Sequence, residues 1–254
     1  MNEIAKTFRA LHQPGNPVLL TNVYDAATAA TIASLPTAPA VATASYAIAA
    51  SIGIDDNALT KSQNLTAIAA IASAIRATNP LKPLTVDLQD GYGDTAELAD
   101  TVRKAIALGA VGCNIEDTDA TGALRSLDEA VERVQMAVRT AAEAGVPDFV
   151  VNARTDVLAG GTVDQAIERG KAFLEAGACT VFIWGPGGRG VSADEVKRLV
   201  AALGMVNVKM NLKEGFLGVQ EIRELGVARI SVGPELWRTA MEAFTEKAKS
   251  LLAL

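Results

Sequence analysis

Eight short apolar runs recur along the chain at intervals of roughly twenty to forty residues. Each run is continuously apolar, which is typical of parallel strands that are covered on both faces. Alanine-rich segments with helical periodicity lie between the runs, and four of them begin with a capping-box pattern. Strands and helices in strict alternation predict an α/β fold of the (β/α)8 barrel type, with an open doubly wound sheet as the alternative. The predicted strands are Val18–Thr21, Ala40–Thr43, Leu84–Leu88, Gly112–Ile115, Phe149–Ala153, Thr180–Ile183, Val206–Met210 and Arg229–Val232.

Composition supports a single barrel and excludes several kinds of partner. Barrels commonly reach the 254 residues of this chain, and no linker divides it, so we expect residues 1–254 to form one domain. The net charge is −6 and the basic residues are scattered, so no nucleic-acid partner is expected. No apolar run approaches membrane-spanning length, and segment 1–15 lacks the apolar core of a signal peptide. We therefore predict a cytoplasmic protein in which Cys113 and Cys179 are buried thiols.

Polar and charged side chains gather where the predicted strands end. The segments VDLQDGYGD (86–94), CNIEDTD (113–119) and VNARTD (151–156) each begin as an apolar run and end in charge. In a (β/α)8 barrel these C-terminal strand ends form the active site. The residues placed there are Asn22, Tyr24, Asp25, Ser45, Tyr46, Asp87, Gln89, Asp90, Glu116, Asp117, Arg154, Asp156, Trp184, Asn207, Lys209, Asn211 and Gly233.

The residue types at these ends suggest a cation and an acidic substrate. Asp87 and Glu116 lie on neighbouring strands, and carboxylates without His or Cys ligands suit Mg²⁺ or Mn²⁺. The alternative is that these acids pair with Arg154, Lys209 or helix N-termini. Arg154 is the candidate clamp for a small anionic carboxylate substrate, because its planar fork makes paired charge-assisted hydrogen bonds. Its alternative role is a salt bridge to Asp156 or Glu116.

Several familiar mechanisms are disfavoured by what the chain lacks. The only histidine is His12, in the predicted N-terminal helix, so neither a Ser-His-Asp nor a Cys-His mechanism is expected. What remains is metal-assisted chemistry that stabilises an enolate-like oxyanion. For the proton transfer, Tyr24, Tyr46 and Asp90 are candidates by position.

Two short motifs are set aside. The GPGGRG segment at 185–190 matches the dinucleotide pattern GxGxxG, but it follows the sixth predicted strand, and the acid expected about twenty residues later is missing. We expect a flexible loop over the barrel mouth, with Arg189 able to meet an anionic substrate. Asn64-Leu65-Thr66 matches a glycosylation acceptor, which we attribute to chance.

With these residues in place, the chain resembles the isocitrate lyase/phosphoenolpyruvate mutase superfamily over nearly its whole length. The matching segments are NVYDAATA, TASYAIAASIGIDD, DLQDGYG, NIEDT, ARTD and ELGVARISVGP. The resemblance implies a Mg²⁺-dependent barrel that acts on 2-oxo or 2-hydroxy acids through a pyruvate-type enolate. It also implies that Asp87 is the direct metal ligand and that Asp56 and Glu116 hold metal-bound waters. The resemblance further implies that the substrate carboxylate is held by Ser45, the backbone near Ala47 and Arg154. Asn207 would then face the substrate.

The superfamily often exchanges its last helix between subunits, so segment 234–254 is expected to pack on a partner in a homo-dimer or homo-tetramer. This sequence also departs from the pattern of the lyases. It has DTDATGALRSL where they carry a K-x-C-G-H loop, Gln89 where they have a second acid, Trp184 where they tend to have Glu, and Ala47 where a glycine is usual.

These departures argue against an isocitrate or methylisocitrate lyase. Gln89 in place of an acid is expected to weaken Mg²⁺ binding or to shift ligation of the metal to Asp90. We predict cleavage or hydrolysis of a C–C bond. The alternatives are a P–C phosphonomutase reaction and a non-catalytic carboxylate-binding relative.

Overall fold

One parallel sheet, closed nearly into a barrel, forms the centre of the molecule. The computed structural model describes residues 1–186 and 189–253, and within them the sheet has nine strands in the order β1-β9-β8-β7-β6-β5-β4-β3-β2. Because β1 and β2 follow one another in the chain, the two ends of this order meet, as in a (β/α)8 barrel and unlike an open sheet. The predicted fold class is thereby confirmed. The strands are β1 Val18–Leu20, β2 Asn22–Val23, β3 Val41–Thr43, β4 Leu84–Asp87, β5 Gly112–Glu116, β6 Val150–Thr155, β7 Thr180–Ile183, β8 Val206–Lys209 and β9 Arg229–Ser231.

The first predicted strand is the one place where the strand pattern differs. The predicted strand Val18–Thr21 contains β1, which pairs with β9, and a second short strand, β2, follows Thr21 and pairs with β3. Asn22 explains how the division between β1 and β2 is held together, because its side chain bonds across the seam. Its Oδ1 accepts hydrogen bonds from the backbone N–H groups of Val232 and Gly233, at 3.1 and 2.7 Å, and its Nδ2 donates to the Thr43 carbonyl at 2.7 Å.

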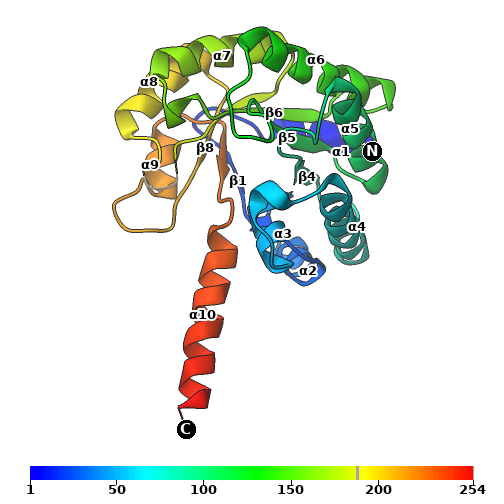
Figure 1. Ribbon diagram of the computed structural model, residues 1–254, viewed down its shortest axis with the longest axis vertical. Helices are drawn as coiled ribbons and strands as arrows, with labels where there is room; N and C mark the ends of the chain where they lie inside the picture. The colour runs from blue at the N-terminus through cyan, green and yellow to red at the C-terminus, as the bar shows by residue number, and fades with distance from the viewer. Residues whose placement is uncertain (187–188, 254) are drawn as a thin grey trace.

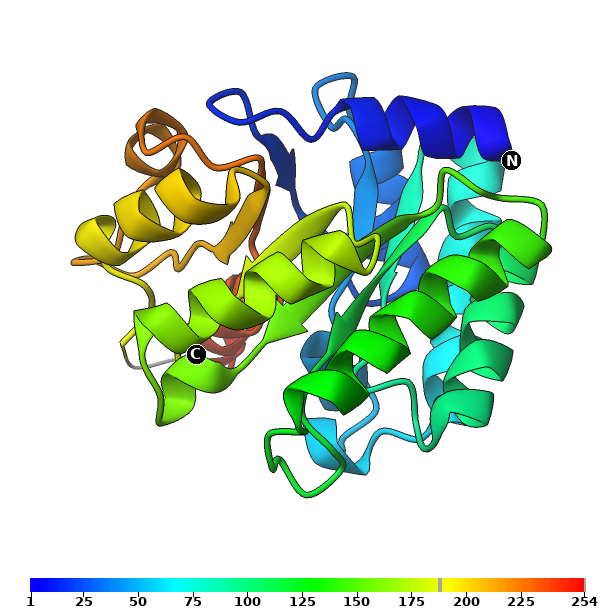
Figure 2. The same ribbon diagram turned by 90° about the horizontal axis from the view of Figure 1, so that it is seen from above.

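Helices cover the outside of this sheet (Figures 1 and 2). The predicted capping boxes at Thr60, Thr162 and Ser192 form both of their hydrogen bonds, whereas Ser126 makes the serine half, accepting from the Glu129 N–H. The helices are α1 Asn2–Ala10, α2 Ala26–Ser34, α3 Ser45–Ser51, α4 Lys61–Thr78, α5 Thr95–Leu108, α6 Leu127–Glu143, α7 Val163–Glu175, α8 Ala193–Leu203, α9 Val219–Glu224 and α10 Glu235–Leu252, with short 3₁₀ turns at Asp56–Ala58 and Val157–Ala159. No helix in the described ranges has the length and apolarity needed to cross a membrane.

Helix α1 covers the N-terminal end of the barrel. Asn2 Nδ2 donates to Asp148 Oδ2 at 2.9 Å, and Arg9 donates to the Phe149 carbonyl at 3.2 Å, just before β6. Phe8 is fully buried and lies so close to Gly112 that a Cβ built there would come within 3.1 Å of its ring. Gly112 therefore makes room for the helix that closes this end.

Hydrogen-bonded polar side chains fill the middle of the barrel, where branched apolar residues are usual. Asn152 bridges two neighbours, donating to Asn114 Oδ1 at 2.8 Å and accepting from Thr180 Oγ1 at 2.7 Å. On the other side, Asn207 Nδ2 donates to Ser231 Oγ at 3.1 Å. This polar layer, formed by Asn114, Asn152, Thr180, Asn207, Arg229 and Ser231, lies directly beneath the charged strand ends, because each strand alternates its faces.

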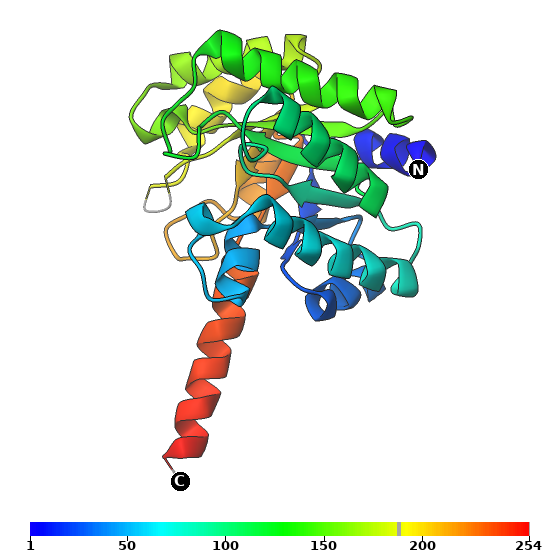
Figure 3. The ribbon, with the colours of Figure 1, turned by 45° about the vertical axis from the view of Figure 1, so that its right-hand side comes forward.

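The last helix, α10, projects away from the barrel (Figures 1 and 3). Among its residues only Glu235, at its start, is buried. Phe244 is 69% exposed, and Met241, Leu251 and Leu252 are exposed as well. This apolar surface has no partner within the described part of the subunit.

Candidate active site

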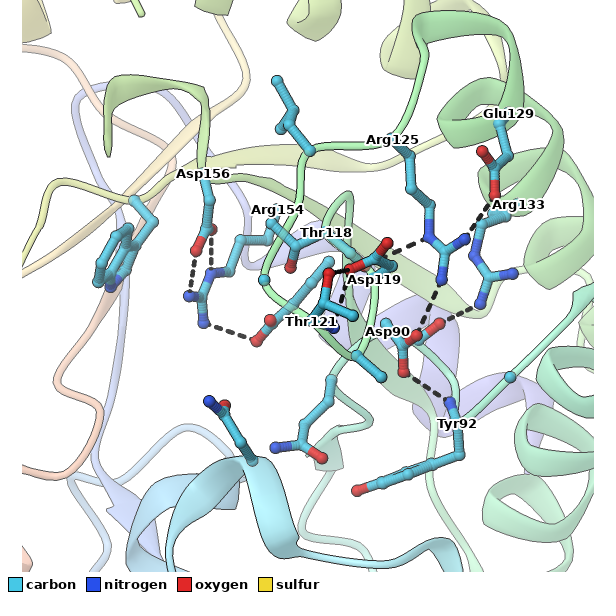
Figure 4. A pocket seen from close by; sticks show the side chains of 18 of the residues that line it. Asp90, Tyr92, Thr118, Asp119, Thr121, Arg125, Glu129, Arg133, Arg154 and Asp156 are labelled. Atoms are coloured by element: carbon cyan, nitrogen blue, oxygen red, sulfur yellow. Dashed lines mark hydrogen bonds and ion pairs between the residues drawn. The ribbon is translucent and has the colours of Figure 1, made fainter. Parts of the chain in front are cut away.

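Arg154 lies at the centre of the charged cluster at the barrel mouth. Its Nη1 donates to Glu116 Oε1 at 2.7 Å, and its Nε and Nη2 donate to the two oxygens of Asp156 at 2.6 and 2.7 Å (Figure 4). The guanidinium also lies over the rings of Trp184 and Phe182, 5.1 and 5.6 Å from their centroids. The salt bridges considered as an alternative are thus formed. Two of the five N–H groups, one on Nη1 and one on Nη2, make no hydrogen bond within the described ranges and are available to a ligand.

Asp87 presents one carboxylate oxygen without a partner. Its Oδ2 accepts the Ser45 backbone N–H at 3.0 Å, and its backbone N–H donates to Thr43 Oγ1 at 2.8 Å. Its Oδ1 is buried and has no hydrogen-bond partner in the part of the chain that is described. Leaving such an atom unpaired is costly in a protein interior. An additional group bound at Oδ1 would remove that cost.

Like charges crowd this end of the barrel. Burial and then the charge of Asp87 raise the pKa of Asp56. Burial raises the pKa of Glu116 to about 8 against the opposing effect of Arg154, and the charges of Asp87, Asp156 and Asp56 add to the rise. A cation among these carboxylates would relieve their repulsion.

Oxygen ligands of this kind fit Mg²⁺ or Mn²⁺. Within the described ranges, no group of three or more His, Cys, Asp or Glu side chains is placed to hold a metal ion by itself. The arrangement thus suits an ion that has few direct carboxylate ligands and keeps several waters, as Mg²⁺ usually does.

Gln89 supports Asp56 with its neutral amide. Its Nε2 donates to the carbonyl of Asp56 at 2.9 Å and to Oδ1 of the same residue at 3.0 Å. Its φ of +50° lies in the left-handed region, so the chain turns sharply immediately after β4. A carboxylate at this position would repel Asp56 unless a cation lay between them.

The candidates for proton transfer have different surroundings. Asp90 lines the pocket but is engaged in hydrogen bonds, because its Oδ2 accepts from Arg125 Nη2 at 3.0 Å and its Oδ1 from the Tyr92 N–H at 2.9 Å (Figure 4). Tyr46 is directed toward α10, where its ring lies 6.1 Å from that of Trp237 and 5.0 Å from the Arg238 guanidinium carbon. Tyr24 is partly buried, and burial raises its pKa. The choice among the three stays open.

The remaining predicted site residues occupy two levels. Ser45 and Ala47 are buried in the first turn of α3, beside Asp87. Asn207 is fully buried in the polar layer below the mouth, and its Oδ1 has no partner among the described residues. Two positions further along, Lys209 Nζ donates to Asn211 Oδ1 and to Glu235 Oε1, the latter at 2.8 Å.

Asn64 supports the site, although the sequence analysis assigned it no role. It is fully buried on α4, and its Nδ2 donates to the Asp87 carbonyl at 2.8 Å and to the Tyr92 hydroxyl at 2.7 Å. The available signal was an asparagine among apolar residues on the buried face of a helix. Its burial is incompatible with glycosylation, so the acceptor pattern is indeed due to chance.

The site opens into a pocket of about 1500 Å³. Its lining includes the strand ends with Glu116, Arg154 and Trp184, and most of the segment 118–125. This segment forms a small hairpin, closed by a bridge between Thr118 and Leu124. Within the 185–190 motif, Gly187 and Gly188 lie outside the described residues, and Arg189 pairs with Glu195.

Fold and site together define a (β/α)8-barrel protein with an acidic mouth and a fixed arginine. Residues 8–252 match the family model "Phosphoenolpyruvate phosphomutase". The chain belongs to this family, within the phosphoenolpyruvate mutase/isocitrate lyase superfamily, and the resemblance found in the sequence is confirmed.

Three known proteins illustrate the relationship. The 2-methylisocitrate lyase of Escherichia coli strain K12 is 42% identical over 111 residues, which are 39% of this chain and 36% of that enzyme. The 2,3-dimethylmalate lyase of Eubacterium barkeri is 31% identical over 207 residues, 78% of this chain and 68% of that enzyme. A crystal structure from Burkholderia cenocepacia J2315, assigned only provisionally as a phosphonomutase, has a TM-score of 0.87 at 36% identity and covers 98% of both chains. The matches to the first three relatives, all 2-methylisocitrate lyases, span between 34% and 45% of their lengths.

Proposed function

We propose that this protein is a Mg²⁺- or Mn²⁺-dependent enzyme that cleaves or hydrolyses a C–C bond of a small 2-oxo or 2-hydroxy acid. The observation that carries the proposal is the unpaired Oδ1 of Asp87 in the same carboxylate cluster as Arg154, whose guanidinium has N–H groups to spare. A cation site and a carboxylate clamp at the same end of the barrel are what an enolate-forming reaction requires. The family membership and the two lyases among the relatives support the same chemistry.

Each residue at the mouth has a proposed role. Asp87 would hold the cation directly, while Asp56 and Glu116 would hold its waters. The bound cation would supply a positive charge for the oxyanion that develops on the substrate. Arg154 would bind the substrate carboxylate through its remaining N–H groups, together with the free backbone N–H groups in the first turn of α3 near Ala47. Trp184 and Asp156 hold the plane of the guanidinium and so orient that contact.

The C–C reaction is preferred to P–C transfer because the hairpin at 118–125 contributes few groups for a transferring phosphoryl. Arg125, the one basic residue on it, is paired with Asp90 and Glu129. A hydrolysis or decarboxylation needs the clamp, the cation and water, and does not require the cysteine of the lyase loop.

We further propose that α10 packs on a second copy of the chain, giving a homo-dimer or homo-tetramer. Its exposed apolar side chains and its projection away from the barrel support this proposal (Figure 3). The two buried, unpaired cysteines favour a reducing, cytoplasmic location.

Oxalate, a planar dianion that resembles a pyruvate enolate, tests the proposal by calorimetric titration with and without Mg²⁺. We expect binding that requires Mg²⁺ and that falls at least tenfold in Asp87→Ala and in Arg154→Ala. The matched controls are Asp194→Ala and Arg198→Ala, both on the exposed surface of α8, which should bind like the wild type. Mg²⁺-independent binding, or equal binding in all four variants, contradicts the proposal.

The substrate itself requires a second experiment. A panel of 2-oxo and 2-hydroxy acids that includes phosphonopyruvate is incubated with the protein and Mg²⁺, and the formation of pyruvate, oxalate, acetate and phosphoenolpyruvate is followed. Turnover of phosphonopyruvate alone would replace the C–C reaction by P–C chemistry. Mg²⁺-dependent oxalate binding without turnover of any compound would indicate a non-catalytic relative.

A further inference from the structure

Arg229 is a buried cation without a carboxylate partner in the part of the chain that is described. It lies on β9 within the polar layer and is 1% exposed. Its Nη2 donates to Asn114 Oδ1 at 3.1 Å and its Nε to Ser231 Oγ at 3.4 Å, while its Nη1 is buried with no partner in the described ranges. Burial lowers the pKa of Arg229 to about 10, so the guanidinium still carries its charge at neutral pH. A charge buried in this way destabilises a protein unless an opposite charge lies nearby.

The carboxylate whose charge acts on Arg229 is that of Asp87. The Arg229 guanidinium reaches across the barrel interior from β9 to Asn114 on β5. Asn114 and Asp87 are paired in register on adjacent strands, which lie about 4.8 Å apart. Among the influences on the pKa of Arg229, burial dominates, and the charge of Asp87 is one of those that oppose it. Arg229 is therefore hydrogen-bonded to the in-register neighbour of the acid that is proposed to bind the cation.

The charges at the mouth show why a cation beneath it matters. When a bound cation keeps all four ionised, the carboxylates of Asp56, Asp87, Glu116 and Asp156 and the guanidinium of Arg154 sum to a formal charge of −3. Several other charged groups around the mouth form ion pairs: Arg125 with Asp90 and Glu129, Arg169 with Asp117, and Glu235 with Lys209 and Arg238. A divalent cation would still leave one negative charge, which repels a dianionic substrate. The charge of Arg229 balances it.

We propose that Arg229 is a positioning residue that acts as the buried counter-charge of the acidic mouth, lowering its affinity for the cation and raising its affinity for a dianionic substrate. It acts through Asn114 and through the field at Asp87 rather than by touching either ligand. The part that concerns the cation and the substrate rests on the proposed function. The electrostatic coupling between Arg229 and Asp87 does not.

Opposite effects on cation and anion binding distinguish this role from a purely structural one. Mn²⁺ affinity is measured by electron paramagnetic resonance, and oxalate affinity by calorimetry at saturating Mn²⁺. In Arg229→Met we expect Mn²⁺ to bind about fivefold to tenfold more tightly and oxalate about tenfold more weakly. Effects of this size are expected when one buried charge near a binding site is removed. Arg229→Lys, which keeps the charge, should return both values to within about threefold of wild type. Parallel loss of both affinities, or no change in either, overturns the proposal.

A thermodynamic cycle tests the charge coupling in the metal-free protein. Urea unfolding is measured for Asp87→Asn, Arg229→Met and the double variant. We expect Arg229→Met to be clearly less destabilising in the Asp87→Asn background than in the wild type. If Arg229→Met alone does not fold, folding of the double variant supports the same conclusion. Additive effects overturn the proposal. If the wild type binds neither Mn²⁺ nor oxalate, the proposed function fails, while this cycle still decides whether Arg229 is the counter-charge of Asp87.

Discussion

Gln89 is the sharpest difference between this site and the acidic pattern of the lyases, and restoring the acid tests how the site is balanced. In Gln89→Glu, the two hydrogen bonds from Nε2 to Asp56 are replaced by two carboxylates in contact. Two like charges about 4 Å apart repel by about 4 kcal/mol at an effective dielectric constant of 20. Protonation of one carboxyl limits this cost to about 1.4 kcal/mol for each pH unit between the ordinary pKa of a carboxyl, about 4, and the solution pH. The pKa of Asp56 is already raised by burial and by Asp87.

We therefore expect Gln89→Glu to lower the free energy of unfolding by about 2–4 kcal/mol at pH 7 in the absence of metal. The folded state of this variant holds a proton that the unfolded chain releases above about pH 4, so the loss grows with rising pH and disappears as the pH falls toward 4. Saturating Mg²⁺ should recover much of the loss, because a cation between the carboxylates turns repulsion into attraction.

Urea unfolding at pH 5 and pH 7, with and without Mg²⁺, measures both effects. Gln220→Glu is the matched control, because Gln220 Nε2 donates to Glu224 Oε1 at 2.7 Å on the exposed surface of α9. That change should cost only a few tenths of a kcal/mol and be indifferent to Mg²⁺. Equal losses in the two variants, or a loss in Gln89→Glu that Mg²⁺ leaves unchanged, would refute the reasoning.

Three further changes probe other parts of the molecule. Burial lowers the pKa of His12 to about 3, so below about pH 6.5 the unfolded chain binds a proton that the folded protein does not. The free energy of unfolding should therefore fall by about 1.4 kcal/mol per pH unit from there downward. In urea unfolding between pH 7 and 5, His12→Asn should lack this pH dependence, and an equal pH dependence in the variant and the wild type would contradict the prediction. Asn64→Ala removes the donor shared by the Asp87 carbonyl and the Tyr92 hydroxyl, and should cost about 1–3 kcal/mol by the same measurement, whereas a neutral result would show that water replaces it. Phe244→Glu on α10 should reduce the mass of the assembly in analytical ultracentrifugation, while Leu81→Glu, 74% exposed on another face, should not; an unchanged mass would place the interface elsewhere.

The sequence predicted the members of the charged cluster because chain order and strand direction suffice to place them. Parallel strands put their C-terminal ends at one edge, so Asp87, Glu116 and Arg154 had to lie together, and Glu116 and Arg154 are indeed paired in register. What the sequence did not predict is how they pair, because hydrogen-bond choice depends on side-chain geometry. Arg154 forms the salt bridges and can also act as a carboxylate clamp, since its five N–H groups allow two salt bridges and still leave donors.

Depth within the barrel could not be predicted in the same way. Asn207, Lys209 and Asn211 share one face of β8 and its extension by their spacing of two residues, but the pattern does not say which level each one occupies. The level is set by the stagger between strands. In the structure Asn207 is opposite Arg229 in register and joins the polar layer, which leaves Lys209 and Asn211 at the mouth.

A polar layer beneath an acidic mouth sets the charge of the whole site. An apolar layer at that depth would stabilise the fold more, because it would bury neither an unpaired guanidinium nor the unpaired Oδ1 of Asn207. It would also leave the carboxylates above it in a medium of low polarity with only Arg154 to offset them, and their pKa values would rise further than those of Asp56 and Glu116 already do. The amides and the guanidinium of the polar layer thus cost stability at the centre of the barrel and in return help to keep the carboxylates ionised at its mouth.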